Sequence, residues 1–379
     1  MRIGIDARFF GPQETGIGRY VERLMAHLAQ IDQVNEYVVL LRKKAWDLWS
    51  PLNPRWSKLP ADERWYSLAE QIKMPGRYRA AKVDLWHLPH FNVPLFWRGP
   101  FVVTIHDLIL NQFPTERAST LGPIVFRAKF MAYEAVIRHA IRDAAQIITV
   151  SEHSRKELSE RFAVNPDRVT VTYEAVDPLP EPSEWSSVAE RGVEQPYLLY
   201  VGNSYPHKNL EKLIEAVQLA QRRGEQFQLV LVGKRDYFSH RLEQLVQRRG
   251  LTNVVFFGFA SDQELAALYQ HAQAYFFPSL SEGFGLPALE AMSCGTPVFA
   301  ARASCLPEVL GSAAHFFDPH DAENIAQSIS IALHDTLERQ RLIAAGTVRV
   351  REFSWRRMAE ETLALYTATY ARLTPKTRS

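Results

Sequence analysis

The chain is poor in cysteine, has no long apolar run and carries almost no net charge. Its 379 residues include two cysteines, Cys294 and Cys305, which exclude a disulfide framework and supply too few thiolates for a structural zinc site. No run of about 18 apolar residues occurs, so the sequence predicts no membrane-spanning helix. Residues 1–6 have the pattern of a short strand followed by a charged residue. They hold no apolar core of signal-peptide length. We therefore expect a cytoplasmic protein, which could still lie against the inner face of a membrane.

The balance of charge argues against one class of partner. Lys and Arg together number 44 and Asp and Glu number 42, which gives a formal net charge of +2. Proteins that bind nucleic acid through its phosphates normally carry a clear basic excess, so we expect no nucleic-acid partner. With 46% apolar residues the chain can bury full cores, and its length fits two domains of roughly 100 to 200 residues each.

Short β-branched or aromatic runs alternate with amphipathic stretches of helical length, a pattern typical of parallel α/β proteins. In the first half, helices are predicted over residues 18–31 and 123–144, and Ser151 is predicted to cap a further helix. Strands are predicted there over residues 2–5, 37–41, 85–87, 101–105, 146–150 and 169–172. A second series of strands is predicted over residues 197–201, 228–232, 254–257, 274–277 and 296–300.

A proline-rich stretch over residues 176–196 separates the two series. It has little periodicity of either kind, so we place a domain boundary in it, with one domain over residues 1–182 and another over residues 183–354. The tail, residues 355–379, holds an amphipathic helix pattern with Met358 and Tyr366 on its apolar stripe. Two Rossmann-like domains with parallel sheets are expected to bind ligands at the carboxyl ends of their strands, in a cleft between them.

The strongest motif is a strand, a glycine-bearing loop and a helix over residues 277–292. Gly283 and Gly285 let the backbone approach a ligand closely, and Pro287 suits the first helical turn. The amides at the start of such a helix favour a phosphate, so the loop can hold a diphosphate. Glu282 and Glu290 flank this anion site and can accept hydrogen bonds from sugar and ribose hydroxyls.

With this motif, read as E-x7-E from Glu282 to Glu290, the chain resembles the retaining glycosyltransferases of family 4. That family has the GT-B architecture of two facing Rossmann-like domains, and the resemblance implies that the C-terminal helix crosses back to the first domain. It also implies that Glu282 contacts the transferred sugar and that Glu290 binds the ribose. The distal phosphate is expected at the backbone of four residues, Gly283, Phe284, Gly285 and Leu286. The alternative is an ordinary strand-to-helix turn with two solvated glutamates.

The resemblance extends to the strand ends before this motif. Lys208 is the expected phosphate clamp, because a cation near a leaving diphosphate neutralises charge that grows in the transition state. Many relatives carry arginine where this chain has Asn203, so one donor-binding cation is missing here. Lys234, after the next strand, is a candidate for a second positive charge on the diphosphate. The backbone near Phe259 is expected to contact the nucleotide base. For Lys208 and Lys234 the alternative is a solvated loop.

Candidate residues of the first half also follow strands. Gly16 and Gly18 open a helix as a glycine-rich loop near the donor phosphates would, although a tight turn for helix packing is the alternative. His106 and Asp107 end an apolar strand, where the cleft is expected. The resemblance implies that His106 lies beside the transferred sugar and bonds it or a neighbouring carbonyl, while Asp107 orients the histidine or the acceptor.

The loop after the strand at 85–87 holds two further histidines. His87 and His90 resemble the acceptor-side loop of the family, and a core or loop-packing role is an equal alternative for both. No Asp-x-Asp triplet supplies a metal site, so we expect no metal or cofactor and assign the diphosphate charge to lysines and helix amides. The resemblance implies retention by a same-face route in which the leaving phosphate takes the acceptor proton.

A basic segment, residues 55–82, has seven Lys and Arg against three Asp and Glu. Its excess of cations could contact anionic lipid or a lipid-linked acceptor. Four tryptophans lie in or near it and could add interfacial aromatics, namely Trp46, Trp49, Trp56 and Trp65. A solvated face with the tryptophans in the core is the alternative.

Together these features predict a retaining, metal-independent enzyme that moves a sugar from a nucleotide diphosphate sugar to a hydroxyl of a glycan or lipid-linked acceptor. The patterns at 104–107 and 206–209 look most like those of the mannosyl- and rhamnosyltransferases of the family. This resemblance implies cell-surface polysaccharide assembly, with mannose from GDP-mannose as the first choice of donor and UDP-sugars as the next. One alternative is a nucleotide-sugar epimerase of similar fold. Another is a catalytically silent sugar-nucleotide-binding protein, which the missing arginine at Asn203 would favour.

Overall fold

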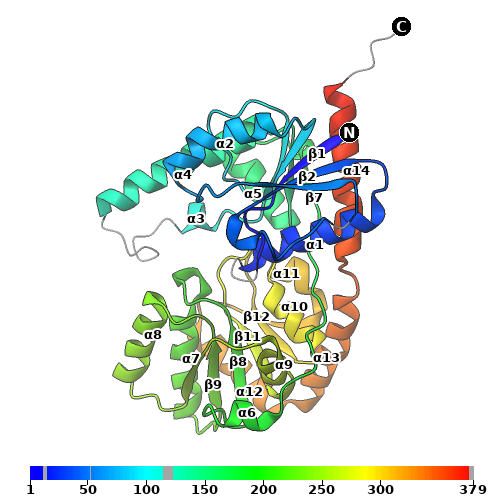
Figure 1. Ribbon diagram of the computed structural model, residues 1–379. Coiled ribbons are helices and arrows are strands. Elements are labelled where there is room, and N and C mark those ends of the chain that lie inside the picture. Colours follow the sequence, from blue (N-terminus) through cyan, green and yellow to red (C-terminus); the bar gives the residue numbers. More distant parts are fainter. Residues whose placement is uncertain (12–14, 52, 114–122, 375–379) are drawn as a thin grey trace. The chain divides into compact units, whose positions relative to one another are not determined.

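A computed structural model describes residues 1–11, 15–51, 53–113 and 123–374. The chain divides into two compact units, each with its own parallel sheet (Figure 1). The first unit spans Met1–Leu108 and Pro123–Glu174 together with the tail from Ser354, and the second spans Ala175–Phe353 together with the segment from Ile109. Contacts thus divide the chain after Glu174, just before the proline-rich stretch. No helix of the described ranges is long and apolar enough to cross a bilayer.

The sheet of the first unit has seven parallel strands in the order β3-β2-β1-β4-β5-β6-β7. Their bounds are β1 (Arg2–Asp6), β2 (Glu36–Leu41), β3 (Trp56–Pro60), β4 (Leu85–Leu88), β5 (Phe101–Ile105), β6 (Gln146–Thr149) and β7 (Val169–Val171). Every strand predicted in this half is present with its ends within one residue. Strand β3 is not among the predicted strands because it lies at the sheet edge and buries one residue, Trp56, so its sequence has no apolar period.

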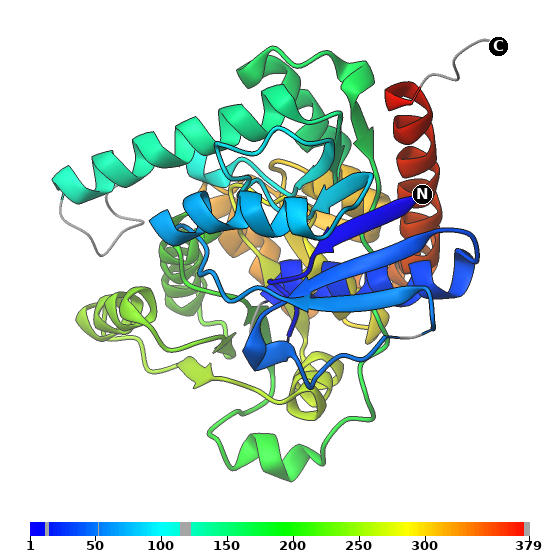
Figure 2. The ribbon, with the colours of Figure 1, turned by 45° about the horizontal axis from the view of Figure 1, so that its top comes forward.

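The helices of the first unit are α1 (Thr15–Ile31), α2 (Leu68–Ala80), α4 (Pro123–Asp143), α5 (Glu152–Phe162) and α14 (Trp355–Leu373). The Ser151 side chain accepts a hydrogen bond from the amide of Ser154, so the predicted N-cap of α5 is confirmed. The tail helix α14 packs on α1 within this unit (Figure 2). It buries Met358 and Tyr366. The chain after Phe353 is therefore part of the first unit.

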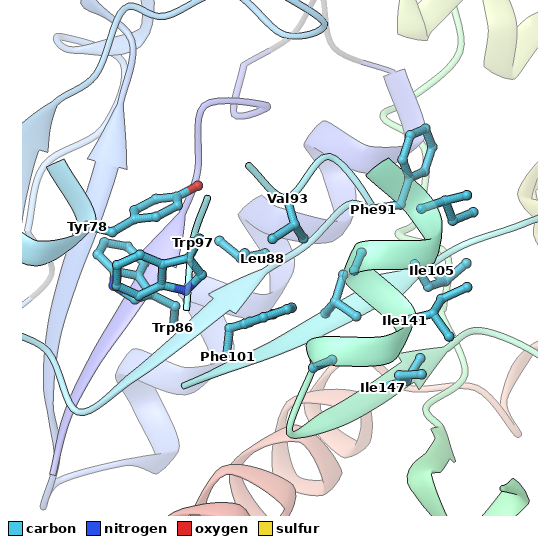
Figure 3. Packing of buried hydrophobic residues seen from close by; sticks show 14 of the residues in the cluster. Tyr78, Trp86, Leu88, Phe91, Val93, Trp97, Phe101, Ile105, Ile141 and Ile147 are labelled. Atoms are coloured by element: carbon cyan, nitrogen blue, oxygen red, sulfur yellow. The ribbon is translucent and has the colours of Figure 1, made fainter. Parts of the chain in front are cut away.

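The core of the first unit is rich in aromatic residues (Figure 3). Trp86 of β4 is 1% exposed and packs on the neighbouring strand β1 at Gly4. A Cβ atom at Gly4 would lie 2.4 Å from the Trp86 ring, so only glycine leaves room for this indole. The Tyr78 ring of α2 packs against Trp86 with ring centroids 4.6 Å apart, which anchors α2 on the sheet.

The second unit contains a six-stranded parallel sheet in the order β10-β9-β8-β11-β12-β13. Its strands are β8 (Tyr197–Val201), β9 (Gln228–Val232), β10 (Val254–Gly258), β11 (Ala274–Phe277), β12 (Val298–Ala301) and β13 (Ala314–Phe317). Five were predicted, whereas the edge strand β13 was not. The strand order reverses between β8 and β11, and in open α/β sheets ligands bind at such a point, outside the carboxyl ends of the strands.

Helices connect these strands and cover the sheet. They are α6 (Trp185–Ala189), α7 (Leu210–Arg222), α8 (Tyr237–Arg248), α9 (Asp262–His271), α10 (Leu286–Ser293), α11 (Leu306–Leu310), α12 (Ala322–His334) and α13 (Thr336–Val350). A four-residue helix, α3 (Ile109–Gln112), also belongs to this unit. Each connection from a strand to the following helix begins at the carboxyl edge of the sheet, and three of these connections build the candidate site.

Candidate active site

Two loops begin at the adjacent strand ends of β8 and β11 in the second unit. The loop after β8 carries Lys208 in a short 3-10 turn, Pro206–Lys208, and the loop after β11 carries Glu282. The amide of Leu280 donates to the carbonyl of His207 over 2.8 Å, which ties the two loops together. The backbone thus brings the predicted clamp residue and the first glutamate of the motif to one place.

Lys208 and Glu282 form an ion pair at this point. The Lys208 ammonium lies 2.7 and 2.8 Å from the two carboxylate oxygens of Glu282. Their side chains are 14% and 10% exposed, so each charge is largely removed from water and is neutralised by the other. The next residue, Asn209, anchors the turn that carries Lys208. Its side chain donates to the carbonyl oxygens of Pro278 and Pro319 at 3.2 and 2.8 Å.

Helix α10 begins directly after this pair. Gly285 has a φ of +101°, and a Cβ atom there would lie 2.9 Å from Leu306, so the tight entry to the helix requires glycine. Pro287 stands in the first turn, as is common for a helix N-terminus. The positive end of the helix dipole therefore points toward the segment that holds Gly283, Phe284, Gly285 and Leu286.

Glu290 lies one turn into α10 and is 6% exposed. The hydroxyl of Tyr269, on α9, donates to the Glu290 carboxylate over 3.4 Å. Burial and the charge of Glu290 raise the pKa of Tyr269 well above its ordinary value, so this hydroxyl keeps its proton. Two glutamates of one motif thus have different partners, a lysine for Glu282 and a tyrosine for Glu290.

A hollow lies at the carboxyl ends of β8, β9 and β10, lined among others by Gly202, Ser204, Lys234 and Arg235. A Cβ atom at Gly233 would lie 2.0 Å from the carbonyl oxygen of Gly202, so the two strand ends approach too closely for a side chain. Lys234 is exposed at this hollow. Arg235, which was not among the predicted site residues, lines it as well and donates to the carbonyl of Phe256 over 3.1 Å.

Two further residues that were predicted to bind the sugar donor differ in exposure. The Phe259 ring is 80% exposed, and its carbonyl accepts a hydrogen bond of 3.1 Å from Arg191. Asn203 is half-buried, its side-chain oxygen accepts from the amide of Tyr205, and its carbonyl accepts from the Tyr200 hydroxyl over 2.8 Å. The residue in the position of the missing arginine therefore organises its own turn.

In the first unit, His106 follows β5 and has an acceptor at each ring nitrogen. Its Nδ1 lies 3.2 Å from a carboxylate oxygen of Glu174, and its Nε2 lies 3.0 Å from the carbonyl oxygen of Pro89. Burial lowers the pKa of His106, but the hydrogen bond and charge of Glu174 outweigh it and raise the pKa above the ordinary value. Because an acceptor oxygen faces each ring nitrogen, the arrangement favours the protonated ring, whose two N–H groups can both donate.

Glu174 was not among the predicted site residues. Asp107 was expected to orient either His106 or the acceptor, whereas Glu174, beyond the end of β7, bonds the ring. Asp107 lies close enough to raise the pKa of His106 and of Glu157. The sequence signal for Glu174 is weak, since it is one acidic residue a few positions after the last strand of the sheet.

The two histidines near β4 have different surroundings. His87 is fully buried, with Nε2 2.8 Å from the Thr104 hydroxyl and Nδ1 bonded to the Tyr366 hydroxyl of α14. Burial, with a smaller effect of His106, lowers the pKa of His87 to about 3, so the ring is neutral. Of the two readings of His87, the geometry favours the core one. His90 packs against Phe91 with ring centroids 4.0 Å apart and the rings tilted by 38°, and its buried Nδ1 has no hydrogen-bond partner in the described ranges.

The glycines expected in a loop near the donor are helical. Helix α1 begins at Thr15, three residues before its predicted start, so Gly16 and Gly18 lie in the first turn at the predicted opening of the helix, within it rather than in a loop before it. Residues 12–14, just before it, lie outside the described part of the chain. Gly16 has an open position in which a Cβ atom would meet nothing within 4 Å. Neither close packing nor a left-handed turn therefore requires glycine at this position.

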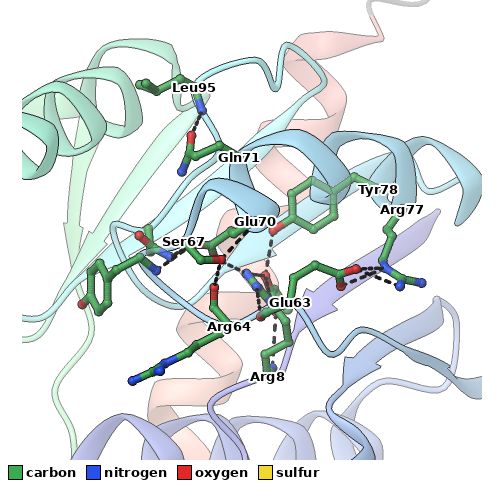
Figure 4. Close-up of polar contacts among 12 residues, drawn as sticks. Arg8, Glu63, Arg64, Ser67, Glu70, Gln71, Arg77, Tyr78 and Leu95 are labelled. Carbon is green, nitrogen blue, oxygen red and sulfur yellow. Dashed lines mark hydrogen bonds and ion pairs between the residues drawn. The ribbon is translucent and has the colours of Figure 1, made fainter.

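A buried ionic cluster fixes the loop after β1 (Figure 4). The Arg8 guanidinium is 1% exposed and donates to both carboxylate oxygens of Asp6 and to Glu70 at 2.8 Å. The Tyr78 hydroxyl donates to Asp6 over 2.7 Å. Burial raises the pKa of Glu70 although Arg8 lies beside it. Since all these groups are engaged, the cluster holds α2 against the end of β1.

Two family models together match most of the chain. Residues 15–178 match the model described as Glycosyltransferase Family 4, and residues 183–349 match the one described as Glycosyl transferases group 1. A curated relative, the O-antigen chain mannosyltransferase B of Escherichia coli, is 32% identical over 308 residues, which cover 79% of this chain and 78% of the relative. The MMP alpha-(1->4)-mannosyltransferase of Mycolicibacterium hassiacum is 32% identical over 283 residues, covering 72% of this chain and 66% of that protein.

Solved structures match nearly the whole chain. The sucrose-phosphate synthase of Thermosynechococcus elongatus has a TM-score of 0.76 at 23% identity and covers 98% of this chain and 100% of its own. Anabaena HepE in complex with UDP-glucose has a TM-score of 0.72 at 19% identity, covering 97% of this chain and 99% of its own. This likeness, together with the two parallel-sheet Rossmann-like units, shows the GT-B fold.

Proposed function

The chain belongs to glycosyltransferase family 4, and we propose that it transfers mannose from GDP-mannose to a hydroxyl group of a cell-surface glycan or a lipid-linked acceptor, with retained anomeric configuration. The observation that carries this proposal is the Lys208–Glu282 ion pair beside the N-terminus of α10, where the strand order reverses. There a cation and a helix end can hold a diphosphate while a carboxylate contacts the sugar.

The choice of donor rests on relatives. Two curated relatives at 32% identity are named mannosyltransferases, one of them for the O-antigen chain, which supports mannose as the sugar and polysaccharide assembly as the setting. GDP is the nucleotide that we infer from the sequence patterns. A structural neighbour binds UDP-glucose, so UDP-sugars are the competing donors in any test.

The proposed chemistry needs one bond to break and one to form. The bond between the anomeric carbon and the diphosphate oxygen breaks, and the acceptor hydroxyl oxygen bonds the same carbon on the same face. The acceptor proton passes to the departing phosphate oxygen. Lys208, with Lys234 as a second cation, neutralises the charge that develops on that diphosphate. Glu282 contacts the sugar, Glu290 the ribose and the backbone near Phe259 the base.

In the first unit we propose His106, Asp107 and His90 as residues near the transferred sugar and the acceptor. Because Glu174 and Pro89 hold both N–H groups of His106, the ring contributes positive charge and cannot take the acceptor proton. The Nδ1 of His90 is buried without a hydrogen-bond partner in the described ranges, so a ligand hydroxyl would reach it only if the loop shifts. This division gives the first unit the acceptor and the second unit the nucleotide.

We further propose that no metal ion takes part. Lys208 and the amides of the first turn of α10 stand where the diphosphate charge is expected, which supports this. The test is turnover of GDP-mannose in excess EDTA, where the proposal expects an unchanged rate. A loss of activity that Mg²⁺ or Mn²⁺ restores would refute it.

We also propose a cytoplasmic location in which the protein contacts anionic lipid through α2, the helix within the basic segment. In the basic segment, Trp56 is 4% exposed and stacks on Tyr37, so it supplies no interfacial ring. Leu68 and Ile72 of α2 are 81% and 73% exposed beside the exposed Lys73, a combination suited to a lipid surface. Flotation with anionic vesicles at low salt should carry the protein upward, and absence of flotation would refute the contact.

The function itself is tested by a thermal-shift screen followed by an assay of turnover. Ligands that bind the folded state raise Tm, so GDP-mannose is expected to give a larger shift than the UDP, ADP and dTDP sugars. Binding must then be accompanied by transfer or slow donor hydrolysis. Binding without either would support the silent-protein alternative that Asn203 favours, and conversion of a free UDP-sugar to its epimer without acceptor would support an epimerase.

A further inference from the structure

We propose that Ser304 and Cys305 are positioning residues that clamp the backbone of Glu282 and so aim its carboxylate. The proposal rests on the proposed function in one respect, since Glu282 is taken to contact the transferred sugar. Neither residue belongs to the E-x7-E motif, and the two precede α11 rather than α10. Their role follows from contacts that join two consecutive loops of the sheet edge.

Both backbone polar groups of Glu282 are bound by this dipeptide. The Glu282 amide donates to the Ser304 hydroxyl oxygen over 3.0 Å. The Cys305 thiol donates to the Glu282 carbonyl oxygen over 3.2 Å. A residue held at its amide and at its carbonyl has little freedom to rotate or shift. The loop after β11, which has no regular structure of its own here, is therefore fixed at this residue by the loop after β12.

The conformation of Ser304 indicates that the fold maintains this contact at a cost. Ser304 has a φ of +48°, in the left-handed region that residues with a Cβ atom rarely adopt. Such conformations persist where the surroundings determine them. In this conformation the side chain of Ser304 meets the Glu282 amide and the next residue directs its thiol to the Glu282 carbonyl.

A third contact comes from the same segment. Leu306 is the first residue of α11, and its side chain packs close to Gly285. A Cβ atom at Gly285 would lie 2.9 Å from this side chain. The segment over residues 304–306 therefore contacts the loop at Glu282 and again at Gly285, on both sides of the candidate phosphate-binding turn. Because the segment contacts the loop at two residues, it fixes the whole loop and not a single atom of it.

The Cys305 side chain is suited to donate rather than to react. It is fully buried, and burial together with the charge of Glu282 raises the pKa of its thiol well above the ordinary value. The sulfur therefore keeps its proton for the carbonyl. Cys294, the other cysteine, is half-buried at the end of α10 and contacts Ser293, so it offers a matched control in the same unit.

The clamp matters because the Lys208–Glu282 contacts are short. Both oxygens of Glu282 lie within 2.8 Å of the Lys208 ammonium. Functional side chains lose effectiveness when they are displaced by about 0.5 Å. Releasing the Glu282 backbone would thus separate the carboxylate from Lys208 and from the sugar while leaving both side chains in the sequence.

The first experiment reads the contact itself, without any substrate. The full-length protein is labelled with ¹⁵N-glutamate, and the Glu282 amide signal is assigned by its absence from Glu282→Gln. Because the amide donates to Ser304, Ser304→Ala is expected to speed its exchange with solvent by about tenfold or more. Cys294→Ala should leave the rate unchanged. An unchanged rate in Ser304→Ala overturns the proposal, whatever the activity.

The second experiment reads the consequence with GDP-mannose as the donor. Cys305→Ala is expected to lower kcat at least about tenfold while the donor KM changes less than about threefold, since the nucleotide contacts remain. Cys305→Ser keeps an O–H donor and should restore most of kcat. Wild-type kcat in Cys305→Ala, or no difference between the serine and alanine variants, contradicts the clamp.

Two further variants separate the clamp from folding and from the proposed function. Ser304→Gly relieves the left-handed φ but removes the acceptor, so it is expected to match or exceed the wild-type Tm and still lose kcat. Full activity in this folded variant counts against the clamp. If Glu282→Gln turns over donor normally, the proposed role of Glu282 fails, while the exchange result still decides whether the clamp exists.

Discussion

Lys208 and Glu282 are 74 positions apart in the chain and form a bidentate ion pair that is almost removed from water. Each residue follows a different strand, and the two strands are neighbours where the sheet order reverses. A diphosphate that enters this site must compete with Glu282 for the ammonium group. In the mechanism that we propose, the pair holds Lys208 in place before the donor binds and releases Glu282 toward the sugar when the diphosphate takes over the ammonium group.

Breaking the pair from one side should damage stability and activity together. Lys208→Met leaves the Glu282 carboxylate without its cation, so we expect a loss of about 2 kcal/mol in unfolding free energy. This loss is smaller than for a fully buried pair because the Lys208 side chain is 14% exposed. We expect kcat to fall by about 10² or more. Denaturant unfolding and donor turnover measure the two effects.

The double variant is the control for this prediction. Lys208→Met with Glu282→Gln removes both charges, so it should be more stable than Lys208→Met alone. It should still be inactive. Strictly additive losses of stability would show that the two side chains do not interact in solution.

Removal of Glu174 should change the protonation of His106. The pKa of His106 is raised in the folded protein, so its pairing with Glu174 stabilises the fold fully below the ordinary histidine pKa, and the contribution is lost as the pH rises through the folded pKa. Glu174→Gln is therefore expected to destabilise the protein more at pH 6 than at pH 9. Denaturant unfolding at both pH values tests this, and an equal loss at both would contradict the imidazolium assignment.

A carboxyl group of α5 should titrate near neutral pH. Burial, together with the charge of Asp107, raises the pKa of Glu157 to about 7. Its charged form is thus disfavoured in the fold, and stability falls as the pH rises from the ordinary glutamate pKa through about 7. Glu157→Gln should raise Tm clearly at pH 8 and much less at pH 5. A lower Tm at pH 8 would mean that the carboxylate is stabilised by a partner.

The ribose assignment gives a prediction about binding alone. Glu290→Ala removes the proposed acceptor for the ribose hydroxyls, so the Tm increase caused by GDP-mannose should disappear. The Tyr269 hydroxyl donates to Glu290, and Tyr269→Phe keeps Glu290 in place, so this control should retain most of the increase. An undiminished shift in Glu290→Ala would remove Glu290 from the donor site.

The buried histidine of β4 should matter for stability and little for catalysis. Tyr366→Phe removes the hydroxyl that α14 gives to His87, and we expect a loss of about 1 to 2 kcal/mol because a buried ring nitrogen is left unpaired. Donor KM and kcat should remain near wild type. A selective fall in kcat with unchanged Tm would instead support the acceptor-binding reading of His87.

The sequence predicts well what depends on local pattern. Buried strands such as β5 and β8 have continuous apolar runs, and the turn before α10 needs glycine at Gly285 and admits Pro287 after it. The edge strand β3 has no such run, and α2 contains Pro75 inside its span, so neither has a clear local signal. The helical placement of Gly16 shows the limit of reading a G-x-G spacing as a loop.

Pairs of residues far apart in the chain are harder to predict. Lys208 and Glu282 were each identified, but their ion pair depends on which strands are neighbours. The partner of His106 was missed because residues 106 and 174 meet only through the order β5-β6-β7. The role of Ser304 and Cys305 is hard to predict for the same reason, because it depends on their contacts with Glu282, which follows the neighbouring strand.

The most direct test is an NMR time course of GDP-mannose with the wild-type protein and with Lys208→Met. We expect the wild type to consume GDP-mannose and the mannose first released to have the anomeric configuration of the donor. Folded Lys208→Met should be slower by about 10² or more. Turnover of a UDP-sugar but not GDP-mannose, inverted product, or an undiminished rate in Lys208→Met would contradict it.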